Sequence, residues 1–318
     1  MKILHVDQNH PALIAGFKAL GHENVEAYDI PLAALQPLLE EVSGIVIRSR
    51  FPLDKALLEK AKKLKFIARL GAGLENIDVA FAQKQNIALF AAPEGNRNAV
   101  GEHTLGLLLA LLRKIPAGDR SIRAGAWLRE AHRGWELEGK TVGIIGYGNT
   151  GQQFAKKLQG FDVKVLCYDI VPDKGDRFAT QVDWETLLQE AEVISIHTPE
   201  TEATQKLIDR DFIQKMKHPF WLLNTARGSA VDTESLIEGL TTKKIRGAGL
   251  DVLEYESRSF TSVFGAPQMP KPLDDLICLE QVVLSPHIGG WTYESHLKLA
   301  QVILDKFETY FHPKIEKK

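Results

Sequence analysis

The sequence predicts an α/β protein built from two doubly wound parallel-sheet domains. Three observations support this prediction. The chain has 318 residues, about the length of two domains. Short β-branched or apolar runs alternate with segments of helical periodicity, as in βαβ units with a parallel sheet. A long apolar helix interrupts this alternation after residue 97, and a second alternating series then begins.

The first series occupies the N-terminal part of the chain. Its predicted strands are residues 2–6, 44–47, 65–68 and 87–90, and its predicted helices are residues 11–20 and 53–64. Strands separated by helices form a parallel sheet. Residues up to about 95 are therefore expected to form one small doubly wound unit. The apolar helix that follows is predicted over residues 102–113.

The second series begins at residue 141. Its predicted strands are residues 141–146, 163–168, 193–197, 221–224, 247–252 and 282–285. The segment 257–275 is rich in Ser, Pro and Gly, which predicts a long loop. Apolar residues at near-helical spacing predict a last helix over residues 293–311, which could belong to either unit.

Composition and charge exclude several classes of partner. Lys and Arg number 39 and Asp and Glu 41, so the net charge of −2 favours neither nucleic acid nor an anionic membrane. Two cysteines cannot build a disulfide framework, and no apolar run is long enough to span a bilayer. The N-terminus lacks a signal-peptide pattern. We therefore expect a soluble, cytoplasmic, two-domain protein, and the composition alone does not indicate its chemistry.

Residues 146–151, Gly-Tyr-Gly-Asn-Thr-Gly, match the G-x-G-x-x-G pattern of dinucleotide-binding loops. The loop directly follows a predicted strand and opens a predicted helix, residues 152–158. The next strand ends in Asp169, which lies 169 − 146 = 23 residues beyond the first glycine. A flavin or adenosyl cofactor, or a structural turn, would share the glycines. The strand, helix and acid together favour a dinucleotide.

Each part of this motif has a physical role. Gly146 allows the tight turn, Gly148 lets the backbone approach the pyrophosphate, and Gly151 lets helix and strand pack closely. The helix N-terminus supplies amide donors and partial positive charge to the phosphates. Asp169 would accept hydrogen bonds from the ribose hydroxyls and repel a 2′-phosphate. Because no Arg follows at once, the motif favours NAD over NADP.

Three ionisable residues follow predicted strands of the second series: Arg227, Glu256 and His287. The carboxyl ends of parallel strands share one edge of a sheet, where ligands bind. Arg offers a planar fork for a carboxylate, and His exchanges protons near neutral pH. A carboxylate beside the His would fix its tautomer. Each residue alone is more often a surface or turn residue. Their joint placement after the glycine motif predicts reduction of a 2-keto acid or oxidation of a 2-hydroxy acid.

The sequence resembles the D-isomer-specific 2-hydroxyacid dehydrogenase family. The matching stretches are residues 71–78, 146–151 with 168–169, 197–199, 224–228, 250–252 and 286–290, in the family's order. The resemblance implies that Arg227 binds the substrate carboxylate and polarises the carbonyl. It implies that His287 is the acid/base and that Glu256 is the carboxylate partner of His287. Residues 102–113 and 120–127 resemble the family's dimerisation arm, which implies a homodimer, although the apolar helix could instead be buried within the chain. We expect no metal ion.

The resemblance further implies a domain organisation. Residues 1–96 plus 292–318 would form the substrate-binding domain, and residues 97–291 the NAD-binding Rossmann domain. The active site would lie in a cleft between two Rossmann/flavodoxin-like domains that close on binding. The implied cofactor-binding residues are Gly146, Gly148, Asn149, Thr150, Gly151, Asp169, His197, Thr198, Pro199, Thr225, Ala226, Asp251 and Gly289.

Within the family, the sequence is most similar to the D-3-phosphoglycerate dehydrogenases of serine biosynthesis. The implied substrate-binding residues are Arg48, Ser49, Arg50, Gly71, Ala72, Gly73 and Asn96. Arg69 and Arg97 add cations that could meet a phosphate, although such arginines could also form a solvated rim. A hydroxypyruvate or glyoxylate reductase remains an alternative, as does an NAD-sensing corepressor that binds partner proteins.

Four departures from the family pattern stand out. Ser257 follows the predicted catalytic Glu256, where the family often has Pro, and Glu254 is a rival two residues earlier. The loop over residues 257–275 is longer than usual. Trp291 stands where a small residue is common, which could narrow the pocket. Because the chain ends at Lys318, we expect it to lack the regulatory domain of longer phosphoglycerate dehydrogenases.

Overall fold

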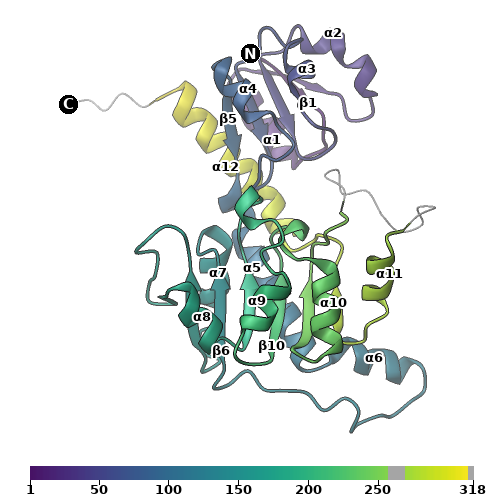
Figure 1. Ribbon diagram of the computed structural model, residues 1–318. Helices are drawn as coiled ribbons and strands as arrows, with labels where there is room; N and C mark the ends of the chain where they lie inside the picture. The colour runs from purple at the N-terminus through teal and green to yellow at the C-terminus, as the bar shows by residue number, and fades with distance from the viewer. Residues whose placement is uncertain (257–268, 314–318) are drawn as a thin grey trace. The chain divides into compact units, whose positions relative to one another are not determined.

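The computed structural model describes residues 1–256 and 269–313. The described chain divides into two compact units. Unit 1 contains Met1–Asn96 and the segment from Trp291 onward, and unit 2 contains the chain from Arg97 to Gly290. Each unit holds one parallel sheet with helices packed on it (Figure 1). The predicted α/β class with two parallel sheets is confirmed.

Unit 1 has a five-stranded sheet with the order β2-β1-β3-β4-β5. Its strands are β1 (Lys2–His5), β2 (Glu23–Glu26), β3 (Gly44–Ile47), β4 (Phe66–Arg69) and β5 (Ala88–Ala91), and all pair in parallel. This is the order of flavodoxin-like sheets. The edge strand β2 was not predicted because its sequence, Glu-Asn-Val-Glu, contains only one apolar residue.

The helices of unit 1 include two long ones that pack together. They are α1 (Pro11–Ala19), α2 (Gln36–Leu39), α3 (Lys55–Leu58), α4 (Val79–Lys84) and α12 (Tyr293–Phe311), with a 3-10 turn η1 (Leu32–Ala34). The last helix, α12, lies against α1 and β5 despite its distance along the chain (Figure 1). The prediction of one helix over residues 53–64 is wrong, because only α3 forms there. An Asp54 cap opens that helix and its C-terminal residue, Leu58, anchors it in the core.

Unit 2 has a seven-stranded sheet with the order β12-β11-β10-β9-β6-β7-β8. Its strands are β6 (Thr141–Ile145), β7 (Lys164–Tyr168), β8 (Thr180–Gln181), β9 (Val193–Ile196), β10 (Phe220–Asn224), β11 (Ile245–Leu250) and β12 (Val282–Leu284). All pair in parallel. Counted from the first strand, β6, the order reverses between β6 and β9, as in Rossmann sheets. Ligands in such folds bind at this switch point, outside the carboxyl ends of the strands.

The helices of unit 2 cover this sheet. They are α6 (Ile115–Arg123), α7 (Asn149–Lys157), α8 (Trp184–Glu190), α9 (Arg210–Lys215), α10 (Thr233–Thr241) and α11 (Lys271–Ile277), with 3-10 turns η2 (Glu202–Thr204) and η3 (Gly228–Ala230). The predicted loop over 257–275 is partly wrong, because its end forms α11. Its Ser, Pro and Gly content hid a helix whose proline lies in the first turn, where proline is tolerated. Residues 257–268 lie outside the described residues.

Helix α5 (Pro93–Leu112) contains the boundary between the units and begins nine residues earlier than predicted, at Pro93 rather than Glu102 (102 − 93 = 9). Its first turns were not predicted because they contain Gly95 and Gly101, and glycine has a low helix propensity. A Cβ at Gly95 would lie 2.8 Å from the backbone of Leu299, and one at Gly101 would lie 3.0 Å from that of Gln153. Close packing therefore requires glycine at positions where helix propensity disfavours it. Of the helices in the described part of the chain, none has the length and apolarity to cross a membrane.

Candidate active site

The glycine loop after β6 has the geometry that its sequence predicts. Gly146 has a φ of +89°, and a Cβ there would lie 2.8 Å from the carbonyl oxygen of His197. A Cβ at Gly151 would lie 2.3 Å from the carbonyl oxygen of Gly146, so helix α7 packs directly on the turn. A Cβ at Gly148 would have nothing within 4 Å. The loop therefore presents open backbone, which fits a pyrophosphate.

Helix α7 begins at Asn149, with Gly148 as its N-cap. Its first amides, which include those of Asn149 and Thr150, have no partner within the helix and can donate to phosphate oxygens. Nearby, Thr198 has a buried hydroxyl with no hydrogen-bond partner among the described residues. The neighbouring Pro199 accepts a hydrogen bond at its carbonyl from Thr204. An open loop, helix amides and an orphaned hydroxyl together fit a dinucleotide.

Asp169 follows β7 and is held by backbone amides. Its carboxylate accepts hydrogen bonds from the amide of Tyr147 at 2.7 Å and from that of Val171 at 2.9 Å. The Tyr147 ring is fully buried, and its hydroxyl donates to Asp176 at 2.7 Å. The glycine loop and the end of β7 are therefore joined through Asp169, which stays half-exposed.

His197 follows β9 and is a neutral residue inside the fold. Burial lowers the pKa of His197 to about 3, so its ring carries no charge at neutral pH. Its Nε2 lies 2.8 Å from the hydroxyl of Ser195, and its Nδ1 lies 3.2 Å from that of Thr150. The His197 ring thus links the end of β9 to the first turn of α7.

Arg227 stands at the N-cap of η3, three residues after β10. The side chain of Asn224 donates to the carbonyl of Arg227 at 2.9 Å and accepts from the amide of Ala226 at 3.1 Å. The hydroxyl of Thr225 pairs with that of Thr104 at 2.9 Å. We missed Asn224 as a positioning residue. The feature that could have identified Asn224 from the sequence is an amide side chain at the end of an otherwise apolar strand.

His287 and Glu256 come together, as the sequence predicts. The Nδ1 of His287 lies 2.5 Å from a carboxylate oxygen of Glu256, and both side chains are partly exposed. The rival Glu254 instead accepts a hydrogen bond from the amide of Thr233 at 2.9 Å and pairs with Lys206 at 3.4 Å. The structure therefore selects Glu256, not Glu254, as the partner of His287.

Asp251, which the resemblance implies as a cofactor-binding residue, has a carboxylate engaged by groups of the protein itself. Its side chain is only 2% exposed. Its carboxylate accepts hydrogen bonds from the amide of Ile288 at 2.9 Å and from the amide of Gly289 at 2.7 Å. Both of its oxygens are thus engaged with the turn that carries His287. The geometry makes Asp251 a support for that turn.

The loop after β3 in unit 1 is anchored by Asp7, a residue that the sequence analysis missed. One oxygen of Asp7 accepts from the amides of Arg48 at 2.6 Å, Ser49 at 3.1 Å and Arg50 at 3.4 Å. The Arg48 guanidinium lies 4.4 Å from the ring centre of Trp291. The loop therefore projects Arg48 over an aromatic ring.

Arg50 does not extend from this loop as its predicted role requires. Its guanidinium donates to the carbonyls of Val6 at 3.1 Å, Ala27 at 2.7 Å and Ile30 at 2.7 Å. These bonds tie Arg50 to its own sheet. The motif Arg-Ser-Arg could not show this, because the three carbonyls come from distant parts of the chain.

The other predicted substrate residues of unit 1 follow β4 or open α5. Gly71 is buried, and a Cβ there would collide with the Arg69 guanidinium at 1.7 Å. Ala72 is exposed and Gly73 half-buried in the bend that follows. The Oδ1 of Asn96 is buried without a hydrogen-bond partner among the described residues. That orphaned acceptor suits contact with a ligand hydroxyl.

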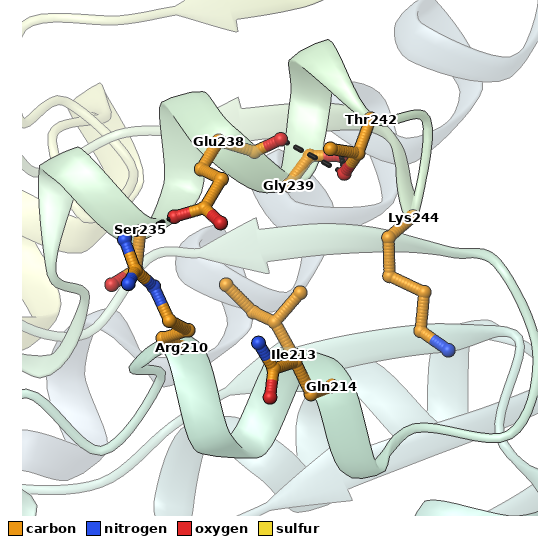
Figure 2. Close-up of a pocket in the computed structure, with 8 residues that line it drawn as sticks. All are labelled: Arg210, Ile213, Gln214, Ser235, Glu238, Gly239, Thr242 and Lys244. Carbon is orange, nitrogen blue, oxygen red and sulfur yellow. Dashed lines mark hydrogen bonds and ion pairs between the residues drawn. The ribbon is translucent and has the colours of Figure 1, made fainter.

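A cavity of about 300 Å³ lies elsewhere in unit 2, between α9, α10 and the start of β11. Figure 2 shows its walls, where Arg210 pairs with Glu238 at 2.5 Å. None of the residues that line it is a predicted site residue. Within residues 1–256 and 269–313, no three His, Cys, Asp or Glu side chains are grouped as metal ligands would be.

Comparison with known proteins shows which family has this fold and this nucleotide-binding loop. Residues 105–289 match the NAD-binding domain of the D-isomer specific 2-hydroxyacid dehydrogenases. The chain is 38% identical to a hydroxypyruvate reductase of Thermotoga maritima over 86% of each chain. It is 37% identical to a D-3-phosphoglycerate dehydrogenase of Archaeoglobus fulgidus, over 85% of this chain and 50% of that protein. A crystal structure of a Thermus thermophilus protein superposes with a TM-score of 0.82, at 31% identity, over 96% of this chain and 94% of that one.

The fold and the nucleotide cradle are those of an NAD-dependent dehydrogenase. The strand order of unit 2, the open glycine loop and the family match all agree on this class. The chain belongs to the D-isomer specific 2-hydroxyacid dehydrogenase family.

Proposed function

We propose that this protein interconverts a D-2-hydroxy acid and its 2-keto acid, with His287 as acid/base. The observation that carries the proposal is the 2.5 Å contact between His287 Nδ1 and Glu256. That contact orients the ring, and we assign the proton exchange with the substrate oxygen to Nε2. Bound NAD would supply or accept the hydride. Unit 2 would hold the NAD through the glycine loop, the first turn of α7 and Asp169.

Arg227 binds the substrate carboxylate and polarises its carbonyl in this proposal. A guanidinium offers paired donors in one plane, which suits a carboxylate. The hydrogen bonds of the Asn224 side chain to the amide of Ala226 and to the carbonyl of Arg227 support the position of Arg227. Arg227 follows β10 and His287 follows β12, the two strands on either side of β11. Both residues therefore stand beyond the carboxyl ends of one parallel sheet, which supports a shared reacting centre.

The first substrate candidate is 3-phosphohydroxypyruvate with its partner 3-phosphoglycerate, as in serine biosynthesis. Its support is a cluster in unit 1 in which the Arg48 guanidinium lies over the Trp291 ring and that ring packs against His296. The rings of His10 and His296 are 5.6 Å apart, and the Nε2 of His296 is buried without a partner among the described residues. A phosphate would supply the missing acceptor and meet the Arg48 charge.

Hydroxypyruvate is the second candidate, and Arg50 favours it. Its guanidinium bonds to three backbone carbonyls, so one of the cations expected for a phosphate is already engaged. A smaller substrate without a phosphate needs less positive charge. The intact contact between His287 and Glu256 favours either substrate over a corepressor without turnover.

A substrate panel tests the proposal. Purified protein with NADH is assayed against 3-phosphohydroxypyruvate, hydroxypyruvate, glyoxylate and pyruvate. We expect turnover of at least one, and a higher kcat/KM for the phosphorylated acid. A preference for hydroxypyruvate over its phosphorylated form would select the second candidate. A folded protein that binds NADH but reduces none of the four would contradict the proposal.

We also propose that the protein is a homodimer. Around α6, several large apolar side chains are exposed, including Ile115 at 58%, Ile122 at 53% and Trp127 at 82%. A second copy is the occupant that the family resemblance implies for this face. Sedimentation equilibrium should give twice the chain mass, and Trp127→Glu should shift it toward the monomer. A monomeric wild-type protein would contradict this proposal.

A further inference from the structure

The turn that carries His287 has an unfavourable backbone conformation. His287 has a φ of +53°, in the left-handed region that residues other than glycine rarely adopt. Neighbouring groups must therefore hold the turn in place. The amide of His287 donates to the carbonyl of Asp251 at 2.8 Å and also to that of Ser285 at 3.0 Å. Asp251 thus contacts the turn through its main chain as well as its side chain.

His103, on α5, completes the support beneath this turn. Its Nε2 lies 2.8 Å from the hydroxyl of Ser285 and 3.2 Å from a carboxylate oxygen of Asp251. The Ser285 hydroxyl donates to the same oxygen of Asp251 at 2.5 Å. Because that hydroxyl gives its proton to Asp251, its oxygen accepts from His103. This assignment places the imidazole proton of His103 on Nε2.

The groups around the Asp251 carboxylate form one hydrogen-bond network. Burial raises the pKa of Asp251, but the hydrogen bonds to its carboxylate outweigh burial and hold that pKa below its ordinary value. The donors are the side chains of His103 and Ser285 and the amides of Ile288 and Gly289. Loss of one side-chain donor leaves a buried carboxylate short of a partner. We expect this loss to affect His287 most, because its backbone conformation in the turn is unfavourable.

We propose that His103 is a positioning residue for the reaction, which acts through Ser285 and Asp251 on the turn that carries His287. The inference rests on the proposed role of His287 as acid/base. His103 itself touches no reacting atom in this assignment. Its Nε2 proton fixes the Ser285 hydroxyl, which in turn orients the Asp251 carboxylate under the amides of Ile288 and Gly289.

Two substitutions at His103 separate this role from simple packing. His103→Leu keeps much of the volume and removes the donor, whereas the Nε2 of His103→Gln can donate from about the same place. We expect His103→Leu to lower kcat roughly 10- to 100-fold, as small misplacements of catalytic groups do. KM for the 2-keto acid and the dissociation constant for NADH, measured by fluorescence, should stay within twofold. His103→Gln should recover most of kcat.

A second readout does not depend on turnover. Hydrogen–deuterium exchange of the peptide that contains residues 285–290 should be faster in His103→Leu than in wild type. Peptides from the glycine loop should be unchanged. The matched control is His132, a half-buried residue whose Nε2 also pairs with a serine hydroxyl, that of Ser121, at 2.7 Å. His132→Leu should change neither the exchange of residues 285–290 nor kcat.

A double-mutant cycle tests whether His103 and Ser285 act together. If both act through Asp251, His103→Leu combined with Ser285→Ala should lose about as much kcat as the worse single variant. Fully multiplicative losses would overturn the proposal. So would a His103→Leu enzyme with wild-type kcat and wild-type exchange at residues 285–290. A wild-type protein inactive on every 2-keto acid would instead overturn the proposed function, while the exchange measurement would still test the network.

Discussion

Each unit has one loop that is held by an aspartate just after a parallel strand: Asp7 after β1 and Asp251 after β11. The two aspartates hold their loops differently. In unit 1, one oxygen of Asp7 accepts all three amides of residues 48–50. In unit 2, both oxygens of the buried Asp251 hold the turn that carries His287. Asp7 is only half-buried, whereas Asp251 is 2% exposed. Both oxygens of Asp251 hold the turn proposed for chemistry. A single oxygen of Asp7 holds the amides of the loop proposed for substrate selection, and the Arg50 side chain ties that loop further to its sheet.

Replacement of the acid/base should give the largest effect. His287→Gln removes the group that exchanges the proton but keeps a polar side chain of similar size. We expect kcat to fall by roughly 10²–10⁴-fold, the usual contribution of general acid–base catalysis. NADH binding, measured by fluorescence titration, should be unchanged. A variant that kept a tenth of wild-type kcat would show that the turn in unit 2 does not carry the chemistry.

Asp251→Asn should give the next largest effect. The amide keeps one acceptor but turns donors toward groups that are themselves donors. We expect about 100-fold lower kcat from the displaced turn. The free energy of unfolding in urea should fall by about 1–3 kcal/mol because buried donors lose their acceptor. If stability fell but kcat did not, Asp251 would be a core residue with no influence on the turn.

The pH dependence of the unfolding free energy tests the role of Asp251 in a second way. The folded-state pKa of Asp251 lies below its ordinary value, so its ionised form stabilises the fold above that value. This stabilisation is lost as the pH falls below about 4, the ordinary aspartate pKa. The difference in unfolding free energy between wild type and Asp251→Asn should therefore be full at neutral pH and shrink in acid. A difference that stayed constant with pH would contradict the assigned direction.

Asp7→Ala should have a smaller effect, and on a different parameter. The amides of residues 48–50 would lose their shared acceptor, and Arg48 would be less well placed. We expect KM for the preferred 2-keto acid to rise about tenfold, or about 1.4 kcal/mol, with kcat within a factor of three. Asp7→Asn, which keeps an acceptor, should lie between wild type and Asp7→Ala. A loss of kcat with an unchanged KM would remove the contrast between the two loops.

Trp291→Leu should have the smallest effect. The ring lies under the Arg48 guanidinium, and an exposed cation–π contact contributes about 0.5–1 kcal/mol. We expect a two- to fivefold rise in KM for 3-phosphohydroxypyruvate and a smaller change for hydroxypyruvate, which lacks the phosphate. Equal changes for both substrates would mean that Trp291 does not act through the charge of Arg48.

Local sequence patterns predicted the nucleotide cradle well. The strand before the glycine loop and the conformation of Gly146 are as expected, because strand periodicity and glycine conformations are local properties. Helix α7 forms as predicted but begins at Asn149, three residues before the predicted start at residue 152. Most strands lie within two residues of their predicted ends. The misses have local causes too. Strand β2 is too polar to detect, and the first turns of α5 contain glycines that only their neighbours explain.

Side-chain partners were harder to predict because they depend on segments far apart in the chain. Both Glu254 and Glu256 fit the sequence pattern, and only the fold brings Glu256 to His287. Arg48 and Arg50 looked equivalent, yet Arg50 bonds to carbonyls from other parts of its sheet. Asp7 and His103 carried no motif at all.

The sequence by itself determined the fold class, the glycine loop and the strand ends at which Arg227 and His287 stand. These features follow from periodicity and from backbone conformations that single residues permit. Only the tertiary structure decided which carboxylate pairs with His287, which arginine is tied to backbone, and that Asp251 supports a turn. The reason is physical: a buried polar side chain takes its role from the donors and acceptors around it, and those come from the whole fold.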